Sequence, residues 1–414
     1  MQRAAHTETA ALHGLFWLAA ANTVGVVCAL LLSWPSLNNI TAPFTFGRIA
    51  PLHFNFQLYG WISLPLVGLL LFFFGQNQKK FAGLALTCWT CALGLGGLSW
   101  LTGHSGGKIF LEWSGPVRVL FPVAMVVLWL VLLLALCSGW RQLSNPGRLW
   151  RVLTLLALLP VPVVMYLASG PDVYPAVNPH SGGATGSSLL GSTLGIVFLF
   201  LLTPLLNGRP RGRNVLAIHF SLFAAHFLLF LATGQGNHSN HEPAQIAALG
   251  SLCIWPPVLW FYYRRFNWAP VIRPWLVGFA AWGVLLCITG WLSFLPQVLE
   301  RIKFTNALTA HAHLAMAGMV TSFLMLIILT LAPRFTHLGQ PKMVWIWQGA
   351  TLLHVVVLTI AGGLEFDLGG AFYQGHFWRQ CLYGLRLFAG VLMWGVSLFW
   401  LVSTLRKKIV WEQV

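Results

Sequence analysis

Residues 305–332 read TNALTAHAHLAMAGMVTSFLMLIILTLA. The stretch contains no Asp, Glu, Lys or Arg and is long enough to cross a bilayer as one helix. Its polar groups gather near the start, where His311 and His313 stand two residues apart. The stretch therefore predicts a membrane-spanning helix that carries a functional group near one end.

The composition extends this prediction to the whole chain. The 414 residues are 57% hydrophobic and 8% charged, with a mean hydropathy of +0.75. Soluble globular domains carry about 25% charged residues. These values exclude a soluble enzyme, a disordered chain and a nucleic-acid-binding protein, and they indicate an all-α integral membrane protein.

Apolar runs separated by Gly, Pro and charged residues recur along the chain. They predict twelve spans at about 10–34, 48–74, 81–103, 116–139, 148–169, 184–206, 214–233, 243–263, 272–298, 305–332, 342–363 and 378–405. Because the connections are short, we expect a single twelve-span membrane domain over residues 1–414. The first run follows no cationic cluster and precedes no small-residue cleavage site, so we expect it to be retained.

The charged residues predict the orientation of these spans. Most of the 24 Lys and Arg residues fall in loops on the side of the chain termini, so we expect both termini in the cytoplasm of a bacterial inner membrane. This sorting explains the net charge of +16 without a nucleic-acid partner. No acid falls in the inner half of a predicted span, and so an intramembrane carboxylate relay is not expected.

Histidine is the informative polar residue inside the predicted spans. Five histidines fall in outer halves: His53, His226, His311, His313 and His354. A polar ring at this depth needs a partner. Their similar depth indicates a shared layer of partners.

The pair His311 and His313 constrains what that partner is. Two residues along a helix correspond to a rotation of about 200°, so the two rings cannot chelate one ion. They can serve two planar cofactors on opposite sides of the helix, and His53 can complete a bis-histidine haem with one of them. The pattern favours haem ligation; a transporter with structural histidines is the alternative.

Two motifs carry a resemblance to a known family. The chain reads FGRIAPLH at residues 46–53 and TAHAH at residues 309–313, with Gly318 following. These motifs resemble subunit I of the haem–copper oxidases, closest to the C-type (cbb-type) cytochrome c oxidase. The resemblance implies a twelve-helix bundle in which His53 and His313 hold a low-spin haem b. It implies that His311 holds a second, high-spin haem.

Three arginines fall near the predicted outer helix ends: Arg48, Arg379 and Arg386. Haem propionates would face this side, and a guanidinium group suits a carboxylate. We therefore expect these arginines to bind propionates. Snorkelling of the side chain to the membrane interface is an equal alternative for Arg48 and Arg379.

The copper site of the family is not recognisable. The family needs three histidines, two of them adjacent, and this chain has no adjacent histidines. The predicted sixth and seventh spans also lack tyrosine and acids. We therefore expect copper to be absent. Two hypotheses for a second metal or distal pocket stay open: a displaced site of His180, His238 and His241, or His226 ligating iron, donating to a gas or hydrogen-bonding a neighbouring helix.

The resemblance implies a membrane haem protein that carries electrons from a low-spin to a high-spin haem within a respiratory complex. A terminal reductase of dioxygen or nitric oxide with an altered metal site is the alternative. Expected partners are other membrane subunits, a cytochrome c-type electron donor, and dioxygen or nitric oxide as ligand. The chain is thus expected to be an oxidoreductase component, and whether it catalyses a reaction itself stays open.

Overall fold

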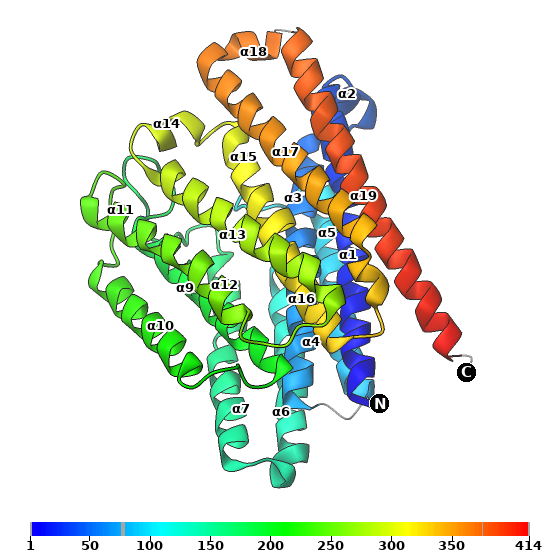
Figure 1. The fold of residues 1–414 in the computed structure, drawn as a ribbon. Coiled ribbons are helices and arrows are strands. Elements are labelled where there is room, and N and C mark those ends of the chain that lie inside the picture. The colour runs from blue at the N-terminus through cyan, green and yellow to red at the C-terminus, as the bar shows by residue number, and fades with distance from the viewer. Residues whose placement is uncertain (1, 76–78, 375, 413–414) are drawn as a thin grey trace. The chain divides into compact units, whose positions relative to one another are not determined.

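The structure is a computed structural model that describes residues 2–75, 79–374 and 376–412. These residues form helices and one isolated antiparallel bridge between Val177 and Ala184 (Figure 1). Among them, twelve helical segments are long and apolar enough to cross a membrane. The prediction of an all-α membrane protein with twelve spans is confirmed.

The candidate spans lie within a few residues of the predicted ones. They are His6–Ser33, Phe46–Phe74, Phe81–Leu101, Gly115–Gln142, Asn145–Ala168, Gly186–Asn207, Val215–Ala232, Pro243–Tyr263, Pro270–Phe294, Asn306–Leu331, Pro341–Leu368 and Phe377–Lys407.

The first span differs from its predicted boundary. Helix α1 (Gln2–Ser33) begins before residue 10, so Glu8 falls inside the candidate span. Its Oε1 lies 4.0 Å from Nε of Arg334. The hydropathy pattern missed these first turns because Thr7 and Glu8 interrupt it, although Thr7 is buried and donates to the Leu331 carbonyl at 3.1 Å.

The chain divides into two compact units. The first comprises Met1–Val173, Ile327–Leu338 and Gly390–Val414, and the second Tyr174–Leu326 and Gly339–Ala389. The single membrane domain expected for residues 1–414 stays a prediction. Three elements contribute residues to both units: α16 (Thr321–Leu331), η8 (Thr336–Gly339) and α19 (His376–Glu412).

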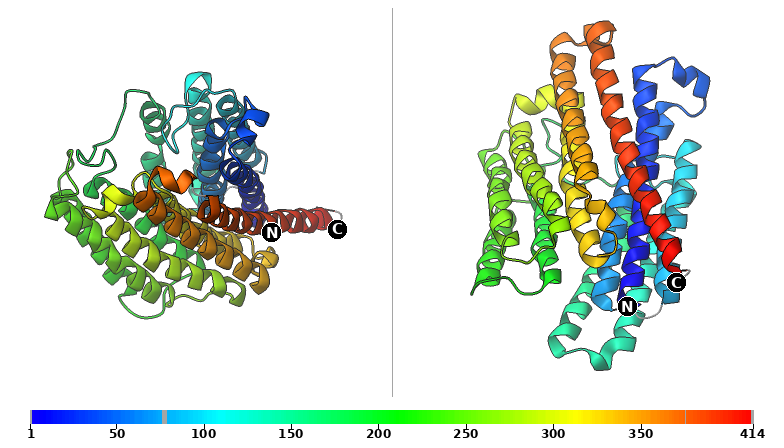
Figure 2. Two further views of the ribbon diagram at one scale, coloured as in Figure 1. Left: turned by 90° about the horizontal axis from the view of Figure 1, so that it is seen from above. Right: turned by 45° about the vertical axis from the view of Figure 1, so that its right-hand side comes forward.

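The first unit is built around α1. Its other elements are α2 (Leu37–Thr41), α3 (Phe46–Asn55), η1 (Phe56–Ile62), α4 (Ser63–Phe74), α5 (Lys79–Leu101), η2 (Gly115–Val119), α6 (Leu120–Gly139), η3 (Trp140–Gln142), α7 (Asn145–Leu158) and α8 (Val161–Ala168). Helix α1 packs against α3, η1, α4 and α5 (Figure 2). Buried aromatic rings fill the core, where Trp113 stacks on Phe121 at 4.7 Å and Tyr59 meets both edge-on.

The second unit holds most of the remaining helices. They are α9 (Gly186–Leu202), η4 (Thr203–Asn207), α10 (Val215–Ala232), α11 (Pro243–Gly250), η5 (Ser251–Ile254), α12 (Trp255–Tyr263), η6 (Pro270–Ile272), α13 (Arg273–Phe294), α14 (Val298–Ile302), α15 (Asn306–His313), η7 (Leu314–Val320), α17 (Pro341–Leu368) and α18 (Gly370–Gln374). Helix α15 packs against α17, and η7 packs against α13. The histidine pair therefore lies on a segment that has neighbours on two sides.

Helix α1 begins, and α19 ends, at the same end of the first unit (Figure 1). The segment Ile327–Leu338 contacts both: Leu331 accepts from Thr7 of α1, and His337 Nε2 lies 2.7 Å from Thr404 Oγ1 of α19. This arrangement is the one that an even number of spans produces. That this end faces the cytoplasm stays a prediction.

Candidate functional site

His53 is oriented by α1 within the first unit. Its Nδ1 lies 2.8 Å from the carbonyl oxygen of Ala21. Because a carbonyl oxygen only accepts, Nδ1 carries the proton and Nε2 has the lone pair. Gly25 makes room for the ring, since a Cβ there would lie 2.8 Å from its Cε1. The backbone of α1 thus determines both the position and the tautomer of His53.

His311 faces α13 within the second unit. Its Nδ1 lies 3.2 Å from Oγ1 of Thr289, and this hydroxyl donates to the Leu285 carbonyl at 2.7 Å. The hydroxyl proton is therefore engaged, and the oxygen accepts from Nδ1. A Cβ on Gly290 would lie 3.1 Å from Cε1 of His311, so this glycine also allows the ring to lie close to the helix.

His313 faces α17 in the same unit. Its Nδ1 lies 2.8 Å from the carbonyl oxygen of Thr309, one turn earlier. Its ring centroid lies 4.5 Å from that of His354, a buried residue of α17. The rings of His311 and His313 thus contact different helices, as their spacing predicts.

One hydrogen-bonding arrangement is common to His53, His311 and His313. Each donates from Nδ1 to an oxygen, so Nε2 is the nitrogen with the lone pair. Metal-ligating histidines are oriented in this way by the ring nitrogen that does not bind the metal. The three residues that the sequence assigns to haem therefore have the tautomer that haem ligation through Nε2 requires.

His226 has the opposite arrangement. Trp255 Nε1 donates to its Nδ1 at 2.8 Å, and its Nε2 lies 2.6 Å from Oγ of Ser251. Both ring nitrogens are therefore hydrogen-bonded to the neighbouring segment η5–α12. Of the roles that the sequence left open, the structure shows the hydrogen bond to a neighbouring element.

A π-helix follows the histidine in both spans. Element η1 begins three residues after His53, and η7 begins directly after His313. Each contains a glycine against a tryptophan of another helix: a Cβ would lie 2.4 Å from Trp17 at Gly60 and 2.7 Å from Trp282 at Gly318. Segments of π-helix are frequent at functional sites. Helical periodicity does not predict these π-helices. The two glycines are the signal in the sequence that could have indicated them.

A buried carboxylate joins four helices at the start of α15. Glu365 Oε2 accepts from the backbone N–H of Asn306 at 2.6 Å, and Oε1 accepts from the Asn306 side-chain amide. The hydroxyls of Tyr373 and Tyr383 donate to the same Oε1 at 3.2 and 3.5 Å. Burial, and then the charge of Glu365, raise the pKa of Tyr373 to about 12. Sequence reasoning missed this cluster, because it placed Glu365 among the loop acids.

Two of the three arginines, Arg386 and Arg379, donate to polar groups of the protein. Arg386 Nη1 donates to Oδ1 of Asn306 at 3.3 Å, and Arg379 Nη1 donates to the Tyr373 carbonyl at 2.6 Å. Both therefore belong to the surroundings of the Glu365 cluster. Arg48 is half-buried in α3, with its guanidinium beside Gly103, where a Cβ would lie 3.5 Å away.

The structure brings together two of the three loop histidines. The rings of His180 and His241 have centroids 4.4 Å apart. His238 instead bonds to Glu242 at 2.9 Å, and His241 Nε2 lies 3.8 Å from Glu300. Within the described ranges, no group of three or more His, Cys, Asp or Glu residues is arranged to hold a metal ion.

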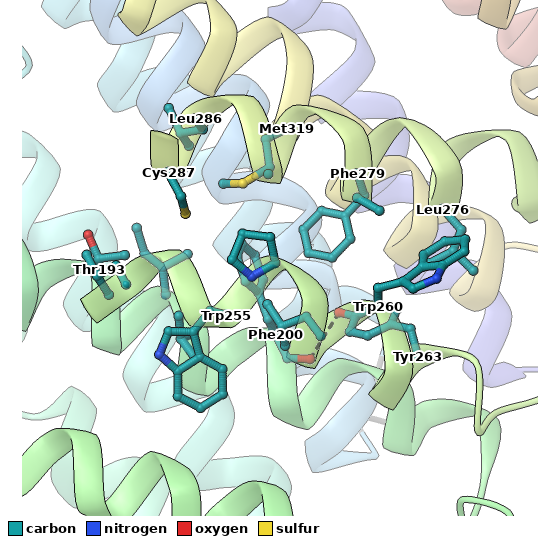
Figure 3. Close-up of a pocket in the computed structure, with 17 residues that line it drawn as sticks. Thr193, Phe200, Trp255, Trp260, Tyr263, Leu276, Phe279, Leu286, Cys287 and Met319 are labelled. Carbon is teal, nitrogen blue, oxygen red and sulfur yellow. Dashed lines mark hydrogen bonds between the residues drawn. The ribbon is translucent and has the colours of Figure 1, made fainter. Parts of the chain in front are cut away.

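An apolar cavity of about 110 Å³ lies in the second unit, lined by α9, η5, α12, α13 and η7. Cys287 and Met319 approach it from the side of α13 and η7, and the Tyr263 hydroxyl at its edge donates to the Phe200 carbonyl at 3.0 Å (Figure 3). Its lining contains no acid and no histidine. Cys287 lies one turn along α13 from Gly290, where an added Cβ would lie 3.1 Å from His311, and the cavity suits a small apolar molecule.

Comparisons with known proteins agree with this fold. No protein-family model matches the chain. The chain is similar to a cytochrome c oxidase subunit 1 homolog of Azorhizobium caulinodans, with 22% identity over 422 positions that cover 91% of this chain and 73% of the relative. It is also similar to a haem–copper terminal oxidase dimer solved by cryo-EM, with a TM-score of 0.63, 12% identity and coverage of 98% of this chain and 84% of that chain. Both similarities agree with the resemblance to haem–copper oxidase subunit I that the sequence motifs carry.

Proposed function

We propose that this chain is a b-type haem subunit of a respiratory complex, in which electrons pass from a low-spin to a high-spin haem. In this proposal His53 and His313 ligate the low-spin haem and His311 ligates the high-spin haem. The observation that carries it is the shared arrangement of the three rings, each donating from Nδ1 to an oxygen. Bound haem would supply one-electron transfer, and the chain supplies its ligands and their orientation.

Each ligand is oriented by its own surroundings. His53 belongs to the first unit and is held by α1, whereas His313 belongs to the second and is held by its own preceding turn. These hydrogen bonds fix the rotation of the rings and raise the basicity of Nε2. Arg48, Arg379 and Arg386 are proposed to bind the carboxylate groups of haem through their guanidinium forks.

The proposal includes the absence of copper. A copper ion beside a haem needs about three imidazoles on fixed elements. His226 uses both ring nitrogens within the protein, and His238 pairs with Glu242. These bonds compete with a metal ion for the same nitrogens. A displaced metal site at His180, His238 and His241 is the alternative, and the contact of His180 with His241 favours it.

A terminal reductase of dioxygen or nitric oxide is the second candidate function. The observation that favours it is the apolar cavity, whose lining residue Cys287 lies one turn along α13 from Gly290, the glycine beside which the His311 ring lies, since both gases are small and apolar. Either function implies other membrane subunits and a cytochrome c-type donor as partners. Either is also proposed to act in a bacterial inner membrane with both chain termini in the cytoplasm.

Carbon monoxide binding tests the proposal, because this ligand binds an open haem and not a bis-histidine haem. We expect a b-type haem spectrum in which one of two haems responds to carbon monoxide. A purified complex without b-type haem, or one in which neither haem responds, contradicts the proposal. Fast cyanide-sensitive oxygen consumption would instead support the terminal reductase.

A further inference from the structure

Helices α15 and α17 contact each other along the whole of α15 (Figure 1). At the start of α15, a Cβ on Gly362 would lie 2.2 Å from the backbone nitrogen of Ala307, so the two backbones approach as closely as a glycine permits. Two turns later, the ring of His313 meets that of His354 at 4.5 Å. The rotation of α15 is therefore set by its contact with α17.

Glu365 follows Gly362 by three residues, which places both on one face of α17. Its carboxylate binds the first residue of α15 twice, through the backbone N–H of Asn306 at 2.6 Å and through the side-chain amide. The first amides of a helix lack acceptors within the helix, and a negative charge near them is stabilising. Thr305 serves the next amide, since its hydroxyl accepts from Ala307 at 3.2 Å. Glu365 thus joins the start of the histidine helix to α17.

The other neighbours of this carboxylate fix it in place. Tyr373 and Tyr383 donate to Oε1, and Arg386 reaches the cluster through Oδ1 of Asn306. Glu365 is 7% exposed, so its charge is held by protein donors rather than by water. A buried carboxylate with these partners is a fixed anchor and not a solvated loop acid.

We infer that Glu365 is the positioning residue of the histidine helix: by fixing the start of α15 against α17 it sets the orientation of the His311 and His313 rings. The inference rests on the proposed function, in which these rings bind haem. Ligand orientation and hydrogen bonding around a haem set its electronic properties. Glu365 therefore tunes the haems without touching them.

The test compares Glu365→Ala and Glu365→Gln with a matched control, Asp367→Asn, an exposed acid two residues further along α17. We expect Glu365→Ala to shift the EPR signal of the ferric low-spin haem and its midpoint potential. Independently of haem, hydrogen exchange at the first amides of α15 should accelerate by about fivefold or more, as for a lost helix cap. Glu365→Gln keeps one acceptor oxygen, so the EPR signal, the midpoint potential and the exchange rate should change less in this variant. In Asp367→Asn none of the three should change.

Full haem content with an unchanged EPR signal, potential and exchange rate in Glu365→Ala overturns the inference and leaves the proposed function intact. A wild-type protein without low-spin haem overturns the proposed function, and the exchange rates alone then decide whether Glu365 anchors α15. If Glu365→Ala does not accumulate, Glu365→Gln and Asn306→Ala are measured in its place. In both variants the EPR signal, the midpoint potential and the exchange rate should change in the direction expected for Glu365→Ala. If none of them changes in either variant, the inference is overturned.

Discussion

A histidine binds iron through one ring nitrogen and is oriented through the other. The opposite directions of His311 and His313 could be predicted, because helix geometry alone sets them. The oxygen partners of His53 and His311 could not, since Ala21 and Thr289 lie on other helices, far along the chain. The tautomers of His53 and His311 are therefore information that only the fold supplies.

We predict that His53→Ala and His313→Ala each remove the low-spin haem signal, and that His311→Ala leaves it in place. The reason is that the two rings of the pair face different helices, α13 and α17. Absorption and EPR spectra of the three purified variants check this. A loss of the six-coordinate signal in His311→Ala, with its retention in His313→Ala, would reverse the assignment.

His226→Ala is the matched control for these variants. We expect it to retain both haem signals and to lose about 1–3 kcal/mol of stability, because Trp255 and Ser251 lose their hydrogen-bond partner. Thermal unfolding and haem content measure the two effects. Loss of a haem from this variant would indicate that His226 is a haem ligand.

A pH effect on stability is predicted at His337, which lies between two spans. Burial, and then the charge of Lys407, lower its pKa from 6.5 to about 4. Between pH 6.5 and pH 4, His337 is therefore protonated in the unfolded chain and mostly neutral in the folded protein. The stabilisation, up to about 3 kcal/mol, is fully present above pH 6.5 and is lost as the pH falls towards 4.

Unfolding temperatures in detergent at pH 7 and pH 4.5 test this effect, with His337→Gln as the comparison. The variant cannot titrate, so its loss of stability across this range should be smaller than that of the wild type. Equal losses in the two proteins would contradict the assignment to His337.

At the scale of elements, the spans are predictable because length and hydropathy alone define a membrane helix. The π-helices η1 and η7 are not, because they depend on packing against residues of other helices, Trp17 and Trp282. The Glu365 cluster was not predicted for a similar reason, because the partners of Glu365 come from α15, α18 and α19. The sequence pattern contains no information on contacts between segments that are far apart in the chain.

Gly318→Ala should destabilise the protein by about 1–3 kcal/mol, since a Cβ there would lie 2.7 Å from Trp282 and force the neighbours to move. Gly349→Ala is the control, because that helical glycine has nothing within 4 Å. The control should be neutral or stabilising by about 0.5–1 kcal/mol. Thermal unfolding of both variants measures the difference, and equal behaviour would show that Gly318 is not required for close packing.

For the molecule as a whole, the sequence predicted the class and the number of spans, which the structure confirms, and a resemblance to haem–copper oxidase subunit I, with which the similar proteins agree. The haem ligands, the loss of copper and the orientation in the membrane stay predictions. The reason is physical: hydropathy reports where a helix meets lipid, whereas a bound metal depends on the nitrogens that converge on it.

We predict weak or absent proton pumping by the reconstituted complex. A pump needs protonatable groups leading inward, and the predicted inner halves of the spans contain no acid. Glu8, which the structure adds to the first span, lies near the start of α1 and pairs with Arg334. Proton uptake by vesicles that contain the complex measures this. Robust outward translocation of protons, in excess of the protons that the reaction itself consumes, would contradict this prediction. It would show that protons follow a route of hydroxyl groups or water instead.

We propose that the chain keeps the haem ligands that its resemblance to the haem–copper oxidases implies and lacks a copper site. Elemental analysis of the purified protein, together with haem quantitation, tests it most directly. We predict two haem irons per chain and no stoichiometric copper, because the chain has no adjacent histidines and His226 is fully hydrogen-bonded. One copper per chain would contradict the account and direct attention to His180, His238 and His241.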